Sequence, residues 1–448
     1  MGLAACSQPL APPELYRPRN VRATPLYQFL EAYYEDVKAI WEERFQKKYG
    51  FWRGFVDQVV ARYVDCGVEE AGFARLKCDT CGAEKLLTLS CKQRGLCPSC
   101  DAKRAAAFAT FLKDELLENV GHCLWTFTLP KMLRPFFMRR RALLSDLARL
   151  AYETVEQLLC EAAGDENARA GVVGVPQTFG SLLQPHPHVH CLASRGLWNT
   201  DGQWIPVPYI DANAAEKLFR FKILRFLKRK GLLDDERIEL LNSFPNSGFS
   251  VDTSPTVWPQ DSDGLERLGR YMLRAPLSLS RIHWSDGART LFYQAKATND
   301  DSPSLFRHPD GETLEVFEFI ARVLTQIPEP RKHNVHYYGA YASRSRALRK
   351  KRGLHLEPTS RNRADATTDE PELTSKHRAA LRKRWANLIR RVHKTDPLLC
   401  SCGGRFRILA FITEPKLIAR IFEHLDKRNT RSRASPQDNH RAPSGSSS

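Results

Sequence analysis

The chain has 448 residues, of which 42% are hydrophobic and 27% charged, so it is globular and too long for one simple core. Its formal net charge of +17 favours an anionic polymer as the partner, although a merely basic protein has the same charge. It has no long apolar run, and residues 1–18 lack the order of a signal peptide. These features exclude a membrane span and predict a cytosolic protein, whose twelve cysteines are expected to bind metal rather than form disulfides.

Helical spacing of apolar residues predicts an N-terminal helical region over residues 1–61, and cysteines and glycines then mark a zinc-binding module over 62–104. Cys78 and Cys81 form one Cys-x-x-Cys pair, and Cys97 and Cys100 form another. Two such pairs at this spacing predict one structural Zn²⁺ held by four thiolates. The two other cysteines of the module, Cys66 and Cys91, are either further zinc ligands or buried apolar residues.

Strand and helix patterns alternate over residues 105–300 and predict an α+β domain built on one sheet. A basic amphipathic helix is expected near its middle, ended by Gly231 as the residue after the C-cap. The expected helices are 105–117, 136–162, 212–230 and 265–273, and the expected strands are 122–129, 171–179, 189–192, 248–252 and 281–296.

Two histidines stand out in this domain. Because strand side chains alternate between faces, His188 and His190 point to one face and Val189 to the other. Two adjacent imidazoles are what a divalent metal requires, so the pair predicts a metal site. The alternative is a polar strand edge with incidental histidines.

Beyond residue 300 the chain becomes strongly basic. The composition predicts a basic and aromatic DNA-binding extension over 301–355, a linker over 356–378, a basic C-terminal subdomain over 379–426 and a disordered tail over 427–448. Cys400 and Cys402 lie in the subdomain, but their spacing is one residue short of a zinc knuckle and no second pair is nearby in the sequence. A second zinc site is therefore not expected there.

Several of these motifs together resemble one family. The stretches are Ser90–Cys100, Gln177–Ser181, Pro187–His190 and Arg270–Pro276, with further likeness at 327–339, Trp385 and Asp396–Cys400. They are similar to the rolling-circle transposases of the insertion-sequence-91 type, within the HUH (His-hydrophobic-His) single-strand endonucleases. The resemblance covers most of residues 20–412. It implies an HUH-type antiparallel sheet flanked by helices, preceded by the zinc module and followed by the basic C-terminal region.

The resemblance also implies roles for particular residues. His188 and His190 match the metal pair, and Tyr271 matches the nucleophile that holds the 5′ end of a nicked DNA strand. Some members carry a second tyrosine four residues earlier, where this chain has Arg267, so it resembles a single-tyrosine member. From the residues alone, Tyr337, Tyr338 and Tyr341 compete for the nucleophile role.

Two imidazoles are too few for Mg²⁺ or Mn²⁺, so a third protein ligand is expected. Gln177 is favoured, and Gln184 and His186 are the other candidates. Basic side chains along the chain are expected to hold DNA phosphates, although each on its own is equally well explained as a solvated surface. They are Lys92, Arg94, Lys228, Arg229, Lys230, Arg270, Arg274, Arg346, Arg349 and Lys350.

The resulting hypothesis is a DNA transposase, associated with the nucleoid, that nicks and rejoins single-stranded DNA at the ends of a mobile element and at its target. A plasmid-type replication initiator or relaxase would use the same chemistry, but the zinc module argues against it. A non-catalytic zinc-containing DNA-binding regulator is the alternative of another class, and it would need neither the histidine pair nor a reactive tyrosine. The sequence predicts no oligomeric state.

Overall fold

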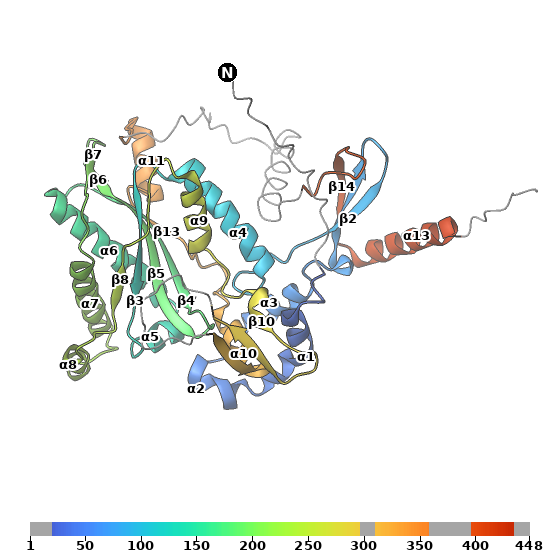
Figure 1. The fold of residues 1–448 in the computed structure, drawn as a ribbon, viewed down its shortest axis with the longest axis horizontal. Helices are drawn as coiled ribbons and strands as arrows, with labels where there is room; N and C mark the ends of the chain where they lie inside the picture. The colour runs from blue at the N-terminus through green and yellow to red at the C-terminus, as the bar shows by residue number, and fades with distance from the viewer. Residues whose placement is uncertain (1–19, 296–309, 358–395, 434–448) are drawn as a thin grey trace, which may run out of the picture. The chain divides into compact units, whose positions relative to one another are not determined.

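The computed structural model describes residues 20–295, 310–357 and 396–433, with side chains up to residue 424 (Figure 1). The chain divides into two compact units. Among the described residues, the first unit contains 20–21, 65–91 and 396–433, and the second contains 22–64, 92–295 and 310–357. The expected linker, from residue 358 on, and residues 379–395 of the expected C-terminal subdomain lie outside the described residues.

The first unit is a three-stranded antiparallel sheet in the order β14-β1-β2. Phe73, Ile412 and Ile418 form its small apolar core. The C-terminal segment is thus no separate subdomain, because β14 pairs with β1 of the cysteine-rich hairpin, and the following helix extends into the first residues of the expected tail. The elements are η2 (Glu69–Ala71), β1 (Phe73–Cys78), β2 (Glu84–Thr88), β14 (Phe406–Ile412) and α13 (Pro415–Arg433).

A six-stranded antiparallel sheet is the centre of the second unit. Its strands run in the order β13-β4-β5-β3-β8, and β9 also pairs with β3. Strand β5 therefore has a partner on each side. The bounds are β3 (His122–Thr128), β4 (Gly171–Phe179), β5 (Pro185–Ser194), β8 (Ser250–Asp252), β9 (Thr256–Val257) and β13 (His336–Gly339).

Helices cover both faces of this sheet, α6 and α7 on one and α4 and α9 on the other (Figure 1). Alternation along β5 decides which residues each face receives. Val189 and Cys191 join the core under α6 and α7, and Leu192 joins the core under α4 and α9. The helices are α4 (Pro98–Phe111), α6 (Leu143–Ala163), α7 (Ala212–Arg229) and α9 (Ser262–Met272).

N-terminal helices also belong to the second unit. Phe29 of α1 packs edge-on against Trp284 and Phe319, with ring centroids 4.9 and 5.8 Å apart. This joins α1 to helix α10 and to a three-stranded sheet, β10-β11-β12. The elements are α1 (Pro25–Ala39), η1 (Trp41–Phe45), α2 (Gln46–Tyr49), α3 (Phe55–Val64), β10 (Ile282–His283), β11 (Thr290–Gln294), β12 (Gly311–Glu315) and α10 (Val316–Gln326).

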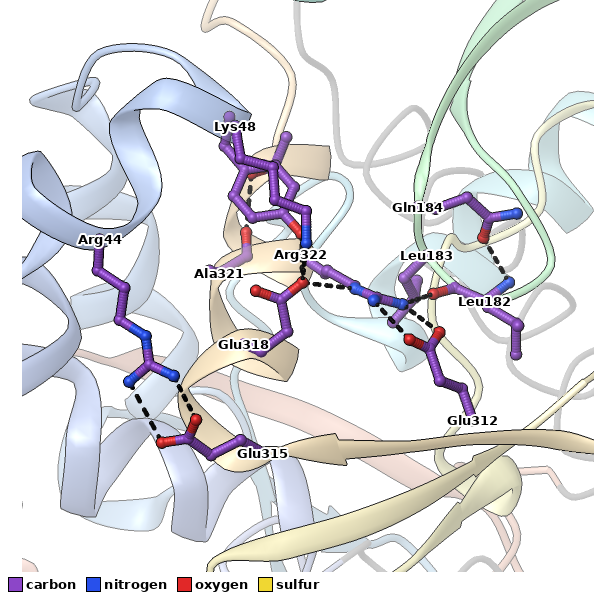
Figure 2. A network of polar contacts seen from close by, with 12 residues as sticks. Arg44, Lys48, Leu182, Leu183, Gln184, Glu312, Glu315, Glu318, Ala321 and Arg322 are labelled. Atoms are coloured by element: carbon purple, nitrogen blue, oxygen red, sulfur yellow. Dashed lines mark hydrogen bonds and ion pairs between the residues drawn. The ribbon is translucent and has the colours of Figure 1, made fainter. Parts of the chain in front are cut away.

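A buried arginine of α10 anchors the loop that leads into β5 (Figure 2). The guanidinium of Arg322 donates to Glu312 at 2.7 Å, to Glu318 at 3.0 Å and to the carbonyl oxygen of Leu182 at 3.1 Å. Gln326 donates to the next carbonyl, that of Leu183, at 3.0 Å. Buried polar groups that are fully hydrogen-bonded make a segment rigid. The start of β5 is therefore fixed from outside its own sheet.

The structure confirms a mixed α+β chain with antiparallel sheets. Helix α7 ends as expected, since Gly231 follows its C-cap with φ of 64°. The strands expected over 281–296 do form, but in the β10-β11-β12 sheet and not in the main one. No helix within the described ranges is both long enough and apolar enough to span a bilayer. The remaining elements are η3 (Leu112–Leu116), α5 (Arg134–Arg139), β6 (Gly196–Trp198), β7 (Trp204–Pro206), α8 (Asp235–Ser243), η4 (Leu279–Arg281) and α11 (Ser343–Arg352).

Candidate active site

His188 and His190 lie side by side on one face of β5. Their ring centroids are 4.9 Å apart, and both side chains are almost completely buried. The register places His188 directly opposite Gln177 of β4 on one side and Thr128 of β3 on the other. His190 is opposite Thr126. The shared face predicted from the sequence is therefore the face that the structure shows.

Each imidazole has one nitrogen engaged by a neighbour. Nδ1 of His188 donates to the backbone carbonyl of His186 at 2.7 Å, which leaves a lone pair on Nε2. Nδ1 of His190 lies 3.1 Å from the hydroxyl of Thr126. Nε2 of His190 is buried and has no hydrogen-bond partner among the described residues. Histidines that bind a metal through one ring nitrogen typically have the other nitrogen hydrogen-bonded in this way, which fixes the orientation of the ring.

Both histidines are held in the neutral form. Burial lowers the pKa of His188 to about 4. Burial, followed by the neighbouring His188 and the charge of Arg274, holds the pKa of His190 well below its usual range. Because only the neutral imidazole has a free lone pair, both rings are suited to ligate a metal at neutral pH.

Helix α9 brings Tyr271 to the histidine pair. Its ring centroid lies 5.1 Å from that of His190, with 68° between the ring planes. The helix approaches α4 closely at Gly269, where a Cβ would lie 2.8 Å from the Cα of Ala109. Any larger residue would push α9 away from α4, so this glycine sets the depth at which Tyr271 sits.

Gln177 connects the sheet to the end of α9. Its side-chain nitrogen donates to the carbonyl oxygen of Met272 at 2.8 Å. Its Oε1 is buried and has no hydrogen-bond partner in the described part of the chain. A buried polar atom without a partner is costly, so such an atom beside two imidazoles is a candidate metal ligand.

The other two candidates for a third ligand are less well placed. Oε1 of Gln184 accepts a hydrogen bond from the backbone of Leu182 at 2.9 Å, so this side chain turns back to its own loop (Figure 2). The ring of His186 lies 5.0 Å from that of His188. Within the described ranges, however, no histidine, cysteine or carboxylate joins the pair to make a compact set of three ligand atoms.

The competing tyrosines take part in packing. Tyr338 stacks on Tyr152 with ring centroids 4.6 Å apart. Tyr341 is fully buried, and its hydroxyl oxygen lies 2.7 Å from Nε2 of His122. Tyr337 packs edge-on against Phe111. Of the four tyrosines considered from the sequence, Tyr271 is the one in ring contact with the histidine pair.

The predicted phosphate-binding residues near the site differ in what they contact. Arg270 forms an ion pair with Glu266 at 2.6 Å. Arg274 lies over the ring of Tyr271 and forms no ion pair in the part of the chain that the structure describes. Arg94 donates to the backbone carbonyls of Lys332 and Glu329. Arg94 and Arg274 both line a cavity of about 450 Å³ beside β4.

The other predicted DNA-binding residues lie further along the unit. Lys228, Arg229 and Lys230 are exposed at the end of α7, where Lys228 pairs with Asp235 of α8. Helix α11 carries Arg346, Arg349 and Lys350 and has no buried residue. Lys92 is exposed.

The cysteines require a correction. Cys78 and Cys81 do not share a site with Cys97 and Cys100, because their sulfur atoms face two cysteines of the C-terminal segment. The Sγ atoms of Cys78, Cys81, Cys400 and Cys402 all lie within 4.8 Å of one another. Cys78 is 3.6 Å from Cys402, and Cys81 is 3.7 Å from Cys400. A tetrahedral zinc with Zn–S bonds of about 2.3 Å has sulfurs about 3.8 Å apart, so the set fits one ion.

The two halves of this cysteine cluster are turns of the same kind. Cys81 and Cys402 are each followed by a glycine with positive φ, 72° at Gly82 and 81° at Gly403. Backbone N–H groups point at the sulfurs, and the one from Cys81 lowers the pKa of Cys78 to about 6. The spacing of Cys400 and Cys402 is therefore compatible with a knuckle, and their missing partners are Cys78 and Cys81, brought near by the β1–β14 pairing.

Cys66 and Cys91, left open by the sequence, lie in the first unit, where the backbone N–H of Cys91 donates to the sulfur of Cys66 at 3.3 Å. Cys97 and Cys100 belong to the second unit, at the start of α4. Sequence reasoning also missed Thr126 and Arg322. Neither has a local signal, because the role of each depends on a partner distant in sequence.

Two family models match parts of the chain. A family model described as "Transposase zinc-binding domain" matches residues 37–129, and one described as "Putative transposase" matches residues 171–349. The first match contains all six cysteines between Cys66 and Cys100. The second contains the histidine pair and Tyr271. The fold and these matches define the class: a transposase with an N-terminal zinc-binding domain.

Two relatives match the chain over about 300 residues each. The chain is 26% identical over 306 residues to a protein of Pseudomonas savastanoi pv. phaseolicola named "Transposase for insertion sequence element IS801", covering 64% of this chain and 70% of the relative. It is 27% identical over 294 residues to "Putative transposase y4qJ" of Sinorhizobium fredii, covering 60% and 70%. The chain is thus similar to transposases of the insertion-sequence-91 type. No solved structure matches it significantly.

Proposed function

We propose that this transposase is an HUH-type endonuclease that nicks and rejoins single-stranded DNA, with Tyr271 holding the 5′ end as a phosphotyrosine during rolling-circle transposition. The ring contact between Tyr271 and His190, with centroids 5.1 Å apart, carries the proposal. A tyrosine that attacks a phosphodiester must lie beside the group that stabilises the phosphate, and α9 brings Tyr271 there. The substrates are the ends of the mobile element and its target, and the place of action is the cytoplasm, at the nucleoid.

His188, His190 and Gln177 would hold Mg²⁺ or Mn²⁺. Two observations support this ligand set: Nε2 of His190 and Oε1 of Gln177 are both buried without a partner among the described residues. Two nitrogens and one oxygen leave room for water and substrate oxygens in a six-coordinate shell. A bound ion supplies positive charge to the non-bridging oxygens of the phosphate and to the departing 3′ oxygen.

The remaining chemistry belongs to the protein. The phenolic oxygen of Tyr271 forms a bond to phosphorus, the bond from phosphorus to the 3′ oxygen breaks, and the phenolic proton is transferred to the departing 3′ oxygen. One phosphodiester replaces another, so the energy for rejoining is retained without ATP. Gln177 holds the helix end that carries Tyr271 through its bond to the Met272 carbonyl. With Arg267 one turn earlier, each subunit forms one such intermediate.

A covalent-adduct experiment tests the proposal. The full chain is incubated with a labelled single-stranded oligonucleotide from the end of the element and with Mn²⁺, and the adduct is resolved on a denaturing gel. We expect wild type to form an adduct and Tyr271→Phe to form none, because phenylalanine has no attacking oxygen. Tyr209→Phe is the matched control, since Tyr209 is 75% exposed ahead of α7. An adduct with Tyr271→Phe equal to that of wild type would show that the nucleophile is wrong.

The same experiment addresses the two alternative functions. A zinc-containing regulator would bind the oligonucleotide without forming an adduct. A replication initiator or relaxase would form one, but the transposase family models and relatives argue against that assignment. Integration of a tagged element end into a target plasmid separates strand transfer between sites from cleavage at an origin.

We also propose a structural Zn²⁺ on Cys78, Cys81, Cys400 and Cys402, on the basis of their sulfur separations. The zinc-binding match also contains Cys97 and Cys100, which the sequence predicts as zinc ligands, and Cys66 and Cys91, which it leaves open. Elemental analysis should therefore find at least one zinc ion per chain, and a chain without zinc would contradict the site.

A further inference from the structure

We infer that Arg274 binds the scissile phosphate beside Tyr271 and neutralises one of its non-bridging oxygens while the tyrosine attacks. The inference rests on the proposed tyrosine nuclease function and adds a substrate-contacting residue to it. It concerns one arginine out of the several on and around α9, and four properties of that arginine support it.

The first property is position. Arg274 follows Tyr271 by three residues, and its backbone N–H donates to the carbonyl oxygen of Tyr271 at 3.3 Å. Its guanidinium carbon lies 4.7 Å from the centroid of the Tyr271 ring and 5.4 Å from that of Phe179, at the end of β4. Two aromatic faces thus hold the cation within reach of the phenol that the proposed reaction uses.

The second property is an uncompensated charge. The neighbouring arginines of α9 have carboxylate partners: Arg270 pairs with Glu266 at 2.6 Å and Arg267 lies 3.7 Å from Asp261. Within the described ranges no carboxylate forms an ion pair with Arg274, and its buried Nε has no hydrogen-bond partner. An arginine that has no carboxylate partner among the described residues, and whose buried Nε is unsatisfied there, is suited to bind an anion, because its planar fork matches two phosphate oxygens.

The third property is proximity to the histidine pair. The Tyr271 ring over which Arg274 lies has its centroid 5.1 Å from that of His190. A phosphate bound at Arg274 beside Tyr271 would therefore lie close to the proposed metal ligands as well.

The fourth property is access. Arg274 is only partly buried, and it lines the cavity of about 450 Å³ beside β4 together with Gln177. Arg94, Arg104 and Arg141 line the same cavity. A DNA strand could follow this basic cavity and place one phosphate at Arg274 while the next nucleotide remains inside.

The reaction defines what Arg274 does. As the bond from the Tyr271 oxygen to phosphorus forms and the bond to the 3′ oxygen breaks, negative charge stays on the two non-bridging oxygens. A donor fixed beforehand at one of these oxygens stabilises that charge without reorganisation. Arg274 gives up no proton and makes no bond, so the balance of the step is unchanged.

Substrates of different charge test this role. Oligonucleotides carry either a normal scissile phosphate or a methylphosphonate, in which one non-bridging oxygen is replaced by a neutral methyl group, as separated stereoisomers. We expect Arg274→Gln to slow adduct formation on the phosphate substrate by about 100- to 1,000-fold, typical of a lost oxyanion donor. On one methylphosphonate stereoisomer the deficit relative to wild type should shrink to less than about tenfold, because the charge that Arg274 neutralises is absent.

Controls separate the possible outcomes. Arg267→Gln, one turn before Tyr271, should match wild type on every substrate, and Arg274→Lys should recover part of the rate because it restores the charge. An equal deficit of Arg274→Gln on phosphate and on both methylphosphonates would mean a merely structural role, and no deficit would mean no role; either result overturns the inference. If wild type formed no adduct, or Tyr271→Phe formed one, the proposed function itself would fail instead.

Discussion

The histidine pair and the cysteine cluster are held in place by different means. His188 and His190 lie on β5, which has partners on both sides and apolar cores under both faces. The four cysteines lie at turns of a small sheet with few buried apolar residues, among them the cluster of Phe73, Ile412 and Ile418. The histidine pair is therefore preorganised by packing, whereas the first unit, which contains the cysteine cluster, has too little apolar burial to hold itself together and is expected to depend on its metal.

This difference matches the chemistry that we propose for the two sites. A site that must accept and release DNA keeps open coordination positions, and a rigid frame prevents its ligands from collapsing onto one another. A closed site of four thiolates has no position left for a substrate, so the ion contributes folding free energy. Three perturbations should act on one site and spare the other.

The largest effect is expected from loss of a zinc ligand. Cys402→Ser should unfold the first unit, because apparent zinc-binding free energies of about 10–16 kcal/mol in zinc-finger peptides exceed what the few buried apolar side chains of this small sheet supply. Hydrogen exchange should show loss of protection in β1 and β14 with β5 unchanged.

Cys160→Ser is the matched control for this experiment. Cys160 is buried in α6, and its thiol donates to the carbonyl oxygen of Ala168 at 3.4 Å. Zinc content and protection of β1 should stay at wild-type values in this variant. If Cys402→Ser left the protection of β1 intact, the dependence of the first unit on its metal would be refuted.

A smaller effect is expected at the anchor of β5. Arg322→Gln should lower the free energy of unfolding by about 3 kcal/mol, because Glu312, Glu318 and the Leu182 carbonyl lose a buried donor. Urea denaturation measures it. Arg44→Gln is the matched control from the same network, since Arg44 pairs with Glu315 at the surface and should cost less than about 1 kcal/mol (Figure 2). Equal costs for the two variants would contradict the anchoring role.

The smallest effect is expected from Thr126. Thr126→Val removes the hydroxyl beside Nδ1 of His190 and should weaken Mn²⁺ binding by about tenfold without changing the unfolding curve. Calorimetric titration with Mn²⁺ measures the affinity, and Thr126→Ser, which keeps the hydroxyl, should bind as wild type does. If Thr126→Ser bound Mn²⁺ as weakly as Thr126→Val, the packing of the threonine methyl group, and not the hydrogen bond of its hydroxyl, would orient His190.

Features that depend on neighbours in sequence were predictable. The period of two along β5 places His188 and His190 on one face and Val189 on the other, and the glycine after α7 adopts the positive φ expected of it. Both follow from backbone geometry within a few residues. The α+β class follows in the same way from alternating strand and helix patterns.

Features that depend on distant pairing were not predictable. Two Cys-x-x-Cys pairs fifteen residues apart are equally consistent with one shared ion or with two sites, and the choice is made by the pairing of β1 with β14. Thr126 acquires its role from the register with His190, and Arg322 from contact with a loop some 140 residues away. A single sequence contains no local signal for such pairings.

The pairing of β1 with β14 also sets an order of events during synthesis. A ribosome must translate some 330 residues after β1 before Ile412, which pairs with Phe73, has been made. The second unit, whose described residues end at 357, can fold while that synthesis continues. The cysteine cluster can therefore be completed only after translation has passed Cys402. A chain that stops before Cys400 lacks two of the four cysteines, and Cys78 and Cys81 are left without them.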